Sequence, residues 1–209
     1  MTHVSNLDRL ADIGVLPVVV IDDETRALPL SLALSEGGVF CAEVTLRTPG
    51  ALASLRAMAE SPNFLVGCGT VLSAEQVDRA VDAGAGFIVS PGFDALVAAR
   101  AHDRGVPYIP GVGTATEIMR ARSAGFVVQK LFPAAQMGGA AAVAALAAPF
   151  SDVTFVPSGG VTLAEVASYR LDAVHTVSTS WIAPRQDIAA GDFDGISQRA
   201  REFTSAAKS

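Results

Sequence analysis

Continuous apolar runs recur along the chain and alternate with segments of helical periodicity. Runs that stay apolar on successive residues are typical of strands covered on both faces, as in a parallel sheet. Four successive runs end at intervals of twenty residues, at Thr70, Ser90, Pro110 and Lys130. The eight predicted strands lie at Val15 to Ile21, Val39 to Leu46, Phe64 to Gly67, Phe87 to Ser90, Val106 to Ile109, Val127 to Lys130, Val153 to Val156 and Ala173 to Val177.

Signals for helix starts and helix ends lie between these runs. Three pairs have the spacing of a capping box, in which a hydroxyl and a Glu or Gln side chain bind backbone amides of the first turn. These pairs are Ser73 with Gln76, Thr114 with Glu117 and Thr162 with Glu165. Glycines stand where a left-handed residue would end a helix. They are Gly38, Gly84, Gly105 and Gly125.

Eight strand and helix units predict an α/β fold, a single-domain (β/α)8 TIM barrel formed by residues 1–209. The alternative is a doubly wound open sheet. No Gly-x-Gly-x-x-Gly sequence follows the first strand to favour that alternative.

Composition narrows the possible partners. Half of the 209 residues are hydrophobic and the formal charge is -6, with no basic cluster, so neither nucleic acid nor an anionic membrane surface is an expected partner. Met1 to Asp12 has no basic and apolar signal-peptide pattern, which predicts a cytoplasmic protein. The long uncharged stretch Leu131 to Ser151 is rich in alanine and interrupted by proline and glycine, and it predicts a loop followed by a buried helix.

The cysteines and histidines do not indicate a metal site. Cys41 and Cys68 lie in separate predicted strands and are expected to be inert buried thiols. His3, His102 and His175 show no spacing typical of metal ligands. We therefore expect no metal.

Lysine is nearly absent, and one of the two lysines ends an apolar strand. Lys130 and Lys208 are the two, while the other thirteen basic residues are arginines. An amine can lose its proton and attack a carbonyl carbon, whereas a guanidinium stays protonated. Lys130 is therefore a candidate nucleophile. The alternative is a lysine that extends from the sheet to keep its charge in water.

A carboxylate also stands inside an apolar strand. Glu43 is costly to bury unless it has a partner or a chemical role. Because the carboxyl ends of barrel strands meet at one mouth, Glu43 is a candidate acid or base there. Its structural alternative is an ion pair with Arg47 or Lys130.

Small residues end two further strands. Gly67-Cys68-Gly69-Thr70 would allow another group to approach the backbone and would bring a hydroxyl to the mouth. Ser158-Gly159-Gly160 precedes the predicted helix start at Thr162, where amides and a helix dipole would favour an anion. The alternative for each segment is a tight turn.

Six segments occur together in an order and spacing that resemble a known family. They are Glu43 to Thr48, Gly67 to Val71, Ser90 to Gly92, Pro110 to Gly111, Lys130 to Ala134 and Ser158 to Gly160. The chain resembles the class I aldolases of 2-dehydro-3-deoxy-phosphogluconate (KDPG), a family that often also cleaves 4-hydroxy-2-oxoglutarate. The resemblance extends from about Val15 to Asp192-Phe193-Asp194.

The resemblance implies a role for each site residue. Lys130 would form the Schiff base and Glu43 would be the general acid and base. The remaining roles would be substrate carboxylate binding for Arg47 and Thr70, pocket walls for Pro91 and Phe132, and phosphate or distal-end binding for Ser158, Gly159, Gly160 and Ser180. The resemblance also implies a small-molecule 2-oxo acid substrate, a homotrimer, and no metal or organic cofactor.

Two segments depart from the family pattern. Ser178-Thr179 stands where the family usually has two glycines, and Pro17 is followed by Val18-Val19-Val20 where some members have an arginine. Added side chains could keep a phosphate away from the backbone amides. Two substrates therefore stay open: phosphorylated KDPG, and a non-phosphorylated acid such as 4-hydroxy-2-oxoglutarate or a related 2-oxo-3-deoxy sugar acid.

Other classes of protein share part of this pattern. A phosphate-binding barrel isomerase or synthase would use Ser158-Gly159-Gly160 but would not form an imine at Lys130. A catalytically inactive barrel would serve as a binding module, although the joint presence of Lys130, Glu43 and Arg47 disfavours that interpretation.

Overall fold

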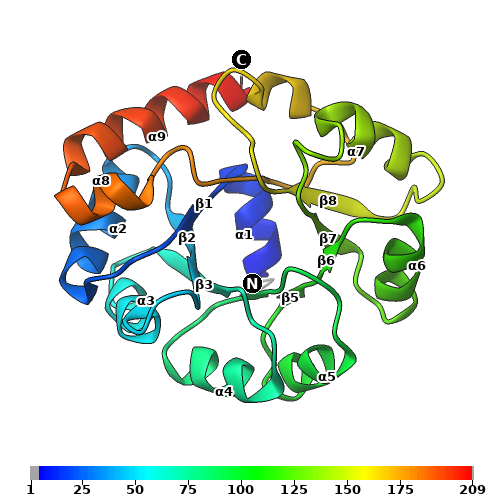
Figure 1. Cartoon of the computed structure of the whole chain (residues 1–209), viewed down its shortest axis with the longest axis horizontal. Helices are drawn as coiled ribbons and strands as arrows, with labels where there is room; N and C mark the ends of the chain where they lie inside the picture. The colour runs from blue at the N-terminus through cyan, green and yellow to red at the C-terminus, as the bar shows by residue number, and fades with distance from the viewer. Residues whose placement is uncertain (1–4, 209) are drawn as a thin grey trace.

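The computed structural model describes residues 5–208, so His3 lies outside the described residues. Parallel strands form a central barrel, and helices surround it (Figure 1). The strands are β1 (Val15–Val19), β2 (Cys41–Thr45), β3 (Leu65–Gly69), β4 (Ile88–Val89), β5 (Tyr108–Ile109), β6 (Gly111–Val112), β7 (Val128–Leu131), β8 (Thr154–Pro157) and β9 (Val177–Thr179). The α-helices are α1 (Asn6–Ile13), α2 (Ala27–Glu36), α3 (Ala51–Ala59), α4 (Ala74–Asp82), α5 (Ala95–Asp103), α6 (Ala115–Ser123), α7 (Gly139–Ala147), α8 (Arg185–Ala190) and α9 (Phe193–Lys208). Two 3-10 helices are η1 (Glu24–Arg26) and η2 (Val166–Tyr169).

The strands close into the predicted (β/α)8 barrel. The order β5-β4-β3-β2-β1-β9 forms one parallel sheet and β6-β7-β8 forms another. β5 and β6 are successive pieces of one strand, interrupted at Pro110, which lacks an amide hydrogen. Bridges from Phe155 to Val174 and from Ser158 to Ser178 connect β8 to the last strand and complete the ring.

Most predicted boundaries agree with the structure to within two residues. The last strand differs more, because β9 begins at Val177, where the predicted run ends. The four predicted stop glycines are left-handed, with φ of 82° at Gly38, 95° at Gly84, 64° at Gly105 and 93° at Gly125. Glycine adopts this conformation without the steric cost that a Cβ would add.

Two of the three predicted capping pairs begin α-helices, as predicted. The third pair forms a hydrogen bond, but the α-helix predicted after it is wrong. Ser73 and Thr114 accept hydrogen bonds from the amides of Gln76 and Glu117 and begin α4 and α6. Thr162 does donate its amide to Glu165, at 3.2 Å. The chain then forms only the four residues of η2, so the predicted helix is not there and no α-helix dipole points at the preceding glycines.

Two further elements differ from the sequence prediction. The helix α1, capped by Ser5, was not among the predicted units. The predicted buried helix is α7, but Val143 is its one buried residue. Alanine-rich sequence is apolar on every side of a helix, so its pattern does not show which side packs inward.

No helix within residues 5–208 is long and apolar enough to cross a membrane.

Candidate active site

Lys130 and Glu43 form a buried ion pair at the centre of the barrel. The Lys130 Nζ donates to Glu43 Oε1 at 3.0 Å and to Oε2 at 3.2 Å. Their exposed fractions are 7% and 1%. Lys130 lies on β7 between Gly111 and Val156 of the neighbouring strands, and Glu43 lies on β2. The sequence left Arg47 and Lys130 open as ion-pair partners of Glu43. In the structure the partner is Lys130.

Glycines on β3 make room for this arrangement. A Cβ at Gly69 would overlap the Glu43 carboxylate, and a Cβ at Gly67 would overlap the Phe87 ring. The sequence prediction that another group approaches the backbone here is therefore confirmed. The approaching groups belong to the protein itself.

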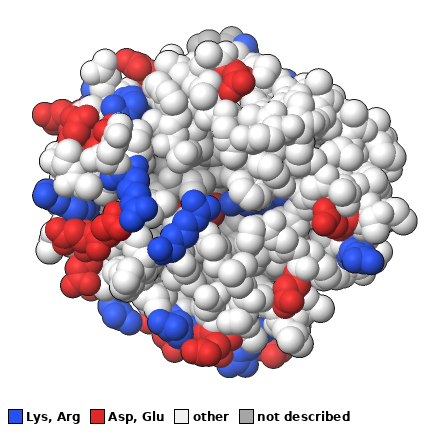
Figure 2. Space-filling model, in the orientation of Figure 1, with Lys and Arg blue, Asp and Glu red and all other residues white. Residues whose placement is uncertain are grey.

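A cavity of about 200 Å³ opens beside the lysine. Figure 2 shows basic side chains reaching across the centre of the barrel face, and the two basic residues that line the cavity are Arg47 and Lys130. The full lining within the described part of the chain is Val18, Val20, Arg47, Lys130, Phe132, Ser158, Gly159 and Ser180. An exposed guanidinium and a buried amine in one cavity suit a small anion with a reactive carbonyl.

One wall of the cavity is apolar. The Lys130 Nζ is 5.7 Å from the centre of the Phe132 ring. The backbone of Gly159 lies against this ring, because a Cβ there would come within 3.1 Å of it. Val18 and Val20 add apolar surface from the end of β1. These two valines were not among the predicted site residues, although their position at the end of a barrel strand indicates the mouth of the barrel.

Four of the predicted site residues are not part of the cavity lining. One is Glu43, which is buried and contacts the lining residue Lys130, and the others are Thr70, Pro91 and Gly160. Thr70 directly follows the glycines of β3 and has φ of 61°. A left-handed conformation is unusual for a β-branched residue and is typical of positions whose surroundings fix the backbone. Pro91 is exposed. Gly160 packs closely on Ala135.

Hydroxyl side chains connect the loops at the far end of the cavity. Ser158 Oγ donates to Ser178 Oγ at 3.2 Å. Thr179 Oγ1 donates to the Val161 carbonyl at 2.7 Å and accepts from the Trp181 amide at 3.0 Å. The Trp181 amide therefore already has a partner within the protein.

The departure from glycine at this point is not a source of backbone strain. Ser178 and Thr179 belong to β9, and neither is among the positive-φ residues of the described chain. Their side chains are buried. They act on the distal end by occupying space and forming hydrogen bonds.

Both cysteines are buried and free. Burial raises the pKa of Cys41, and it raises the pKa of Cys68 to about 12. Neither thiol forms much reactive thiolate at neutral pH. Across residues 5–208, no group of three or more His, Cys, Asp or Glu side chains is arranged to hold a metal ion.

The fold and this site define a carbon–carbon lyase of the aldolase class built on a (β/α)8 barrel. The chain belongs to the family of KDPG and KHG aldolases, whose family model matches residues 7–199. KHG denotes 4-hydroxy-2-oxoglutarate.

Named relatives match over nearly the whole chain. A 2-dehydro-3-deoxy-phosphogluconate aldolase of Treponema pallidum is 45% identical over 90% of this chain and 91% of its own. The KDPG aldolase of Legionella pneumophila, solved with pyruvate captured as a covalent carbinolamine intermediate, is 34% identical, with a TM-score of 0.89 over 95% of this chain and 97% of its own. The aldolase of Zymomonas mobilis, solved with 3-phosphoglycerate, is 36% identical, with a TM-score of 0.87 over 96% and 95%.

Proposed function

We propose that this aldolase cleaves 2-dehydro-3-deoxy-6-phosphogluconate to pyruvate and glyceraldehyde 3-phosphate through an imine at Lys130. The observation that carries the proposal is the buried contact of Lys130 Nζ with Glu43, at 3.0 Å, beside a cavity that also contains Arg47. An amine nucleophile, a base within hydrogen-bond reach and a cation for the substrate carboxylate are the three groups that this chemistry requires.

The imine supplies the electron sink for bond cleavage. The Lys130 amine attacks the C2 ketone of the substrate to give a carbinolamine, which loses water and becomes an iminium ion. When the C3–C4 bond breaks, its electron pair moves into the iminium and forms an enamine. The C4 hydroxyl gives up its proton and leaves as the aldehyde. Protonation of the enamine at C3 and hydrolysis of the imine then release pyruvate and the free amine.

Glu43 would transfer the protons in these steps. Both of its carboxylate oxygens lie within 3.2 Å of the amine. Through a water, a carboxylate at this position can take the C4 hydroxyl proton and later return one to C3. Its burial excludes most bulk water from these transfers.

Arg47 and the aromatic wall would orient the substrate. The exposed guanidinium of Arg47 lines the cavity and can bind the pyruvyl carboxylate with two hydrogen bonds. The centre of the Phe132 ring is 5.7 Å from the Lys130 Nζ, so the ring limits where the reacting carbon can lie. Thr70 and Pro91 would lie at the edge of the mouth. Thr70 would be a second ligand of the substrate carboxylate, and Pro91 would form part of the pocket wall.

The distal end of the substrate would lie against the loops after β8 and β9. Ser158, Gly159 and Ser180 line the cavity on that side, and backbone amides near Gly159 and Gly160 would donate to phosphate oxygens. Relatives that carry the name of the phosphorylated substrate, and the 3-phosphoglycerate in the Zymomonas structure, support the phosphorylated sugar acid as the substrate. The hydroxyl pair of Ser158 and Ser178 favours the second candidate, a non-phosphorylated hydroxy-oxo acid with a smaller, neutral or carboxylate distal end.

We also propose a domain organisation, a location and an oligomeric state for the active enzyme. Residues 1–209 would act as one (β/α)8 domain in the cytoplasm. As the family resemblance implies, the chain would assemble into a homotrimer and would need no organic cofactor. Light scattering coupled to size exclusion should then give three times the monomer mass of 21.4 kDa. A monomer or dimer mass would contradict the trimer without affecting the imine chemistry.

Borohydride reduction in the presence of pyruvate tests the central step. The reduced adduct should appear on the peptide that contains Lys130 and nowhere else, because an imine at that amine is the species that borohydride traps. Lys208, the other lysine of the chain, is the internal control. Active enzyme without an adduct, or an adduct on Lys208, would exclude the proposed intermediate and return the barrel isomerase or synthase to consideration.

A further inference from the structure

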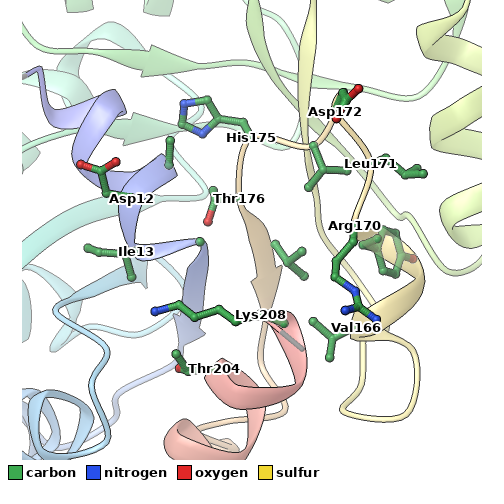
Figure 3. A pocket seen from close by; sticks show the side chains of 16 residues that line it. Asp12, Ile13, Val166, Arg170, Leu171, Asp172, His175, Thr176, Thr204 and Lys208 are labelled. Carbon is green, nitrogen blue, oxygen red and sulfur yellow. The ribbon is translucent and has the colours of Figure 1, made fainter.

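A second, larger cavity of about 480 Å³ lies at the opposite end of the barrel (Figure 3). It opens where β1 and β9 begin, beside Gly14 and Val177, whereas Lys130 lies at the carboxyl ends of the strands. Its volume is in the range of sites for small metabolites. The chemistry proposed above does not use it.

Three residues of the lining carry polar atoms without partners in the described part of the chain. Thr176 is 1% exposed, and its Oγ1 has no hydrogen-bond partner among the described residues. The Thr204 Oγ1 and the His175 Nδ1 are also buried and have no hydrogen-bond partner among the described residues. Figure 3 shows the Thr176 hydroxyl directed into the cavity, with His175 above it and Thr204 below. Most buried polar atoms in proteins have a partner, so three unpartnered atoms around one cavity indicate that something polar binds there.

Four charged residues at the rim of the cavity are exposed and form no ion pair with any described residue. Lys208 and Arg170 supply two cations, and Asp12 and Asp172 supply two anions. None of the four forms an ion pair within residues 5–208, although charged groups elsewhere on the surface do so repeatedly. In the view of Figure 3, Lys208 and Arg170 reach in from one side while Asp12 and Asp172 lie toward the other. The lining therefore presents one cationic and one anionic side.

His175 adds no further charge to the lining. Burial lowers the pKa of His175 below its usual value of 6.5, so its imidazole is neutral at neutral pH. The helix α1 ends at Gly14 beside the cavity, and the carbonyl end of a helix attracts a cationic group. A ligand with a net charge would leave one side of the lining unmatched, whereas a ligand with both charges would match both sides.

We infer that this cavity binds a small zwitterion of the amino acid class. The ligand carboxylate would lie against Lys208 and Arg170, and its ammonium would lie toward Asp12 and Asp172. The hydroxyls of Thr176 and Thr204 can each donate or accept, so they can hydrogen-bond either end.

The test is a thermal-shift screen of the full chain with the twenty common amino acids, followed by calorimetric titration of those that raise the Tm. At least one amino acid should bind, and its Kd should be at least tenfold lower than that of the same carbon skeleton with only the carboxylate or only the amine. Thr176→Val should weaken binding about tenfold or more. Because its hydroxyl is unpartnered without ligand, this variant should melt no lower than the parent protein in the absence of amino acid.

Two control variants distinguish binding in this cavity from binding elsewhere on the protein. Ser158→Ala, at the opposite end of the barrel, should bind the amino acid as the parent does, which would show that Ser158 of the aldolase cavity does not contribute to this binding. Lys208→Gln should weaken binding, whereas Arg120→Gln, a loss of the same charge on the exposed surface of α6, should not.

Three results would overturn the inference. They are a screen in which no amino acid raises the Tm or binds, an affinity that Thr176→Val leaves unchanged, and equal affinity for the carboxylate-only analogue. The last result would identify the cavity as a site for simple anions. None of these outcomes bears on the imine at Lys130.

Discussion

Gly69 leaves the space that the Glu43 carboxylate occupies. The two residues lie on neighbouring strands, with Gly69 paired to Thr45 and Glu43 paired to Gly67, and a Cβ at Gly69 would overlap the carboxylate. The position of the proposed acid and base therefore depends on the absence of a side chain on β3.

This relationship gives a first prediction. Gly69→Ala should displace Glu43 from the Lys130 amine and lower kcat about a hundredfold or more, the usual contribution of general acid and base catalysis. Crowding a packed core should also cost about 1–3 kcal/mol of unfolding free energy. Steady-state kinetics and urea unfolding measure the two effects. Gly92→Ala is the matched control, since nothing lies within 4 Å of the Cβ it would add. Unchanged kcat in Gly69→Ala would show that the carboxylate need not be where the structure has it.

Lys130→Arg should be as inactive as Lys130→Ala. The substitution keeps a positive charge beside Glu43 but removes the only group there that can form an imine. Pyruvate release and borohydride labelling should both fall to background. If Lys130→Arg kept more than about a hundredth of the parent rate, the lysine would be a charge that orients substrate, and the nucleophile would have to be sought elsewhere.

Glu43→Gln should separate imine formation from turnover. The amide keeps the shape of the side chain, so pyruvate should still be trapped at Lys130 by borohydride. Cleavage should slow about a hundredfold or more because proton transfer to and from the substrate is lost. If Glu43→Gln lost both the trapping of pyruvate at Lys130 and the cleavage of substrate, Glu43 would act on the amine itself.

Substrate preference tests the distal end. If phosphate oxygens contact the loops after β8 and β9, the phosphorylated sugar acid should have a higher kcat/KM than its dephosphorylated analogue, because binding energy from the remote group contributes at the reacting centre. Replacing Ser178 and Thr179 together with glycines should widen that preference, since the Trp181 amide then loses its Thr179 partner and can face the ligand. Equal or reversed preference in the parent protein would identify a simpler hydroxy-oxo acid as the substrate.

His175 should make stability depend on pH near neutrality. Burial lowers the pKa of the folded-state imidazole, partly offset by the negative charge of Asp8. Between the unfolded value of about 6.5 and the lower folded value, the unfolded chain binds more protons, so unfolding free energy falls as pH is lowered through this range. Urea unfolding of the parent and of His175→Gln at pH 8 and pH 5 should show a larger acid loss in the parent. Parallel pH profiles of the two proteins would contradict the buried neutral state.

Local sequence determined most of the barrel and the chemical types at its mouth. Continuous apolar runs fixed eight strands because both faces of a barrel strand are covered, and Gly38, Gly84, Gly105 and Gly125 fixed helix ends because glycine alone adopts positive φ at little cost. The near absence of lysine singled out Lys130, and the cost of burying a carboxylate singled out Glu43.

Tertiary structure decided what lies next to what. Lys130 and Glu43 are 87 residues apart, and their contact depends on barrel closure and on strand register, since a shift of one residue would turn each side chain to the other face. The same closure chose Lys130 over Arg47 as the partner of Glu43. The capping pair at Thr162 predicted a helix that packing reduced to the single short turn of η2.

The cavity at the far end of the barrel also depends on tertiary structure and not on a local sequence pattern. Asp12, Thr176 and Lys208 have no motif in common, and they meet because the end of α1, the start of β9 and the end of α9 converge there. Local patterns record the backbone conformation and burial that each segment favours, because those preferences act between near neighbours. Contacts between distant segments arise only when all the strands have closed the ring.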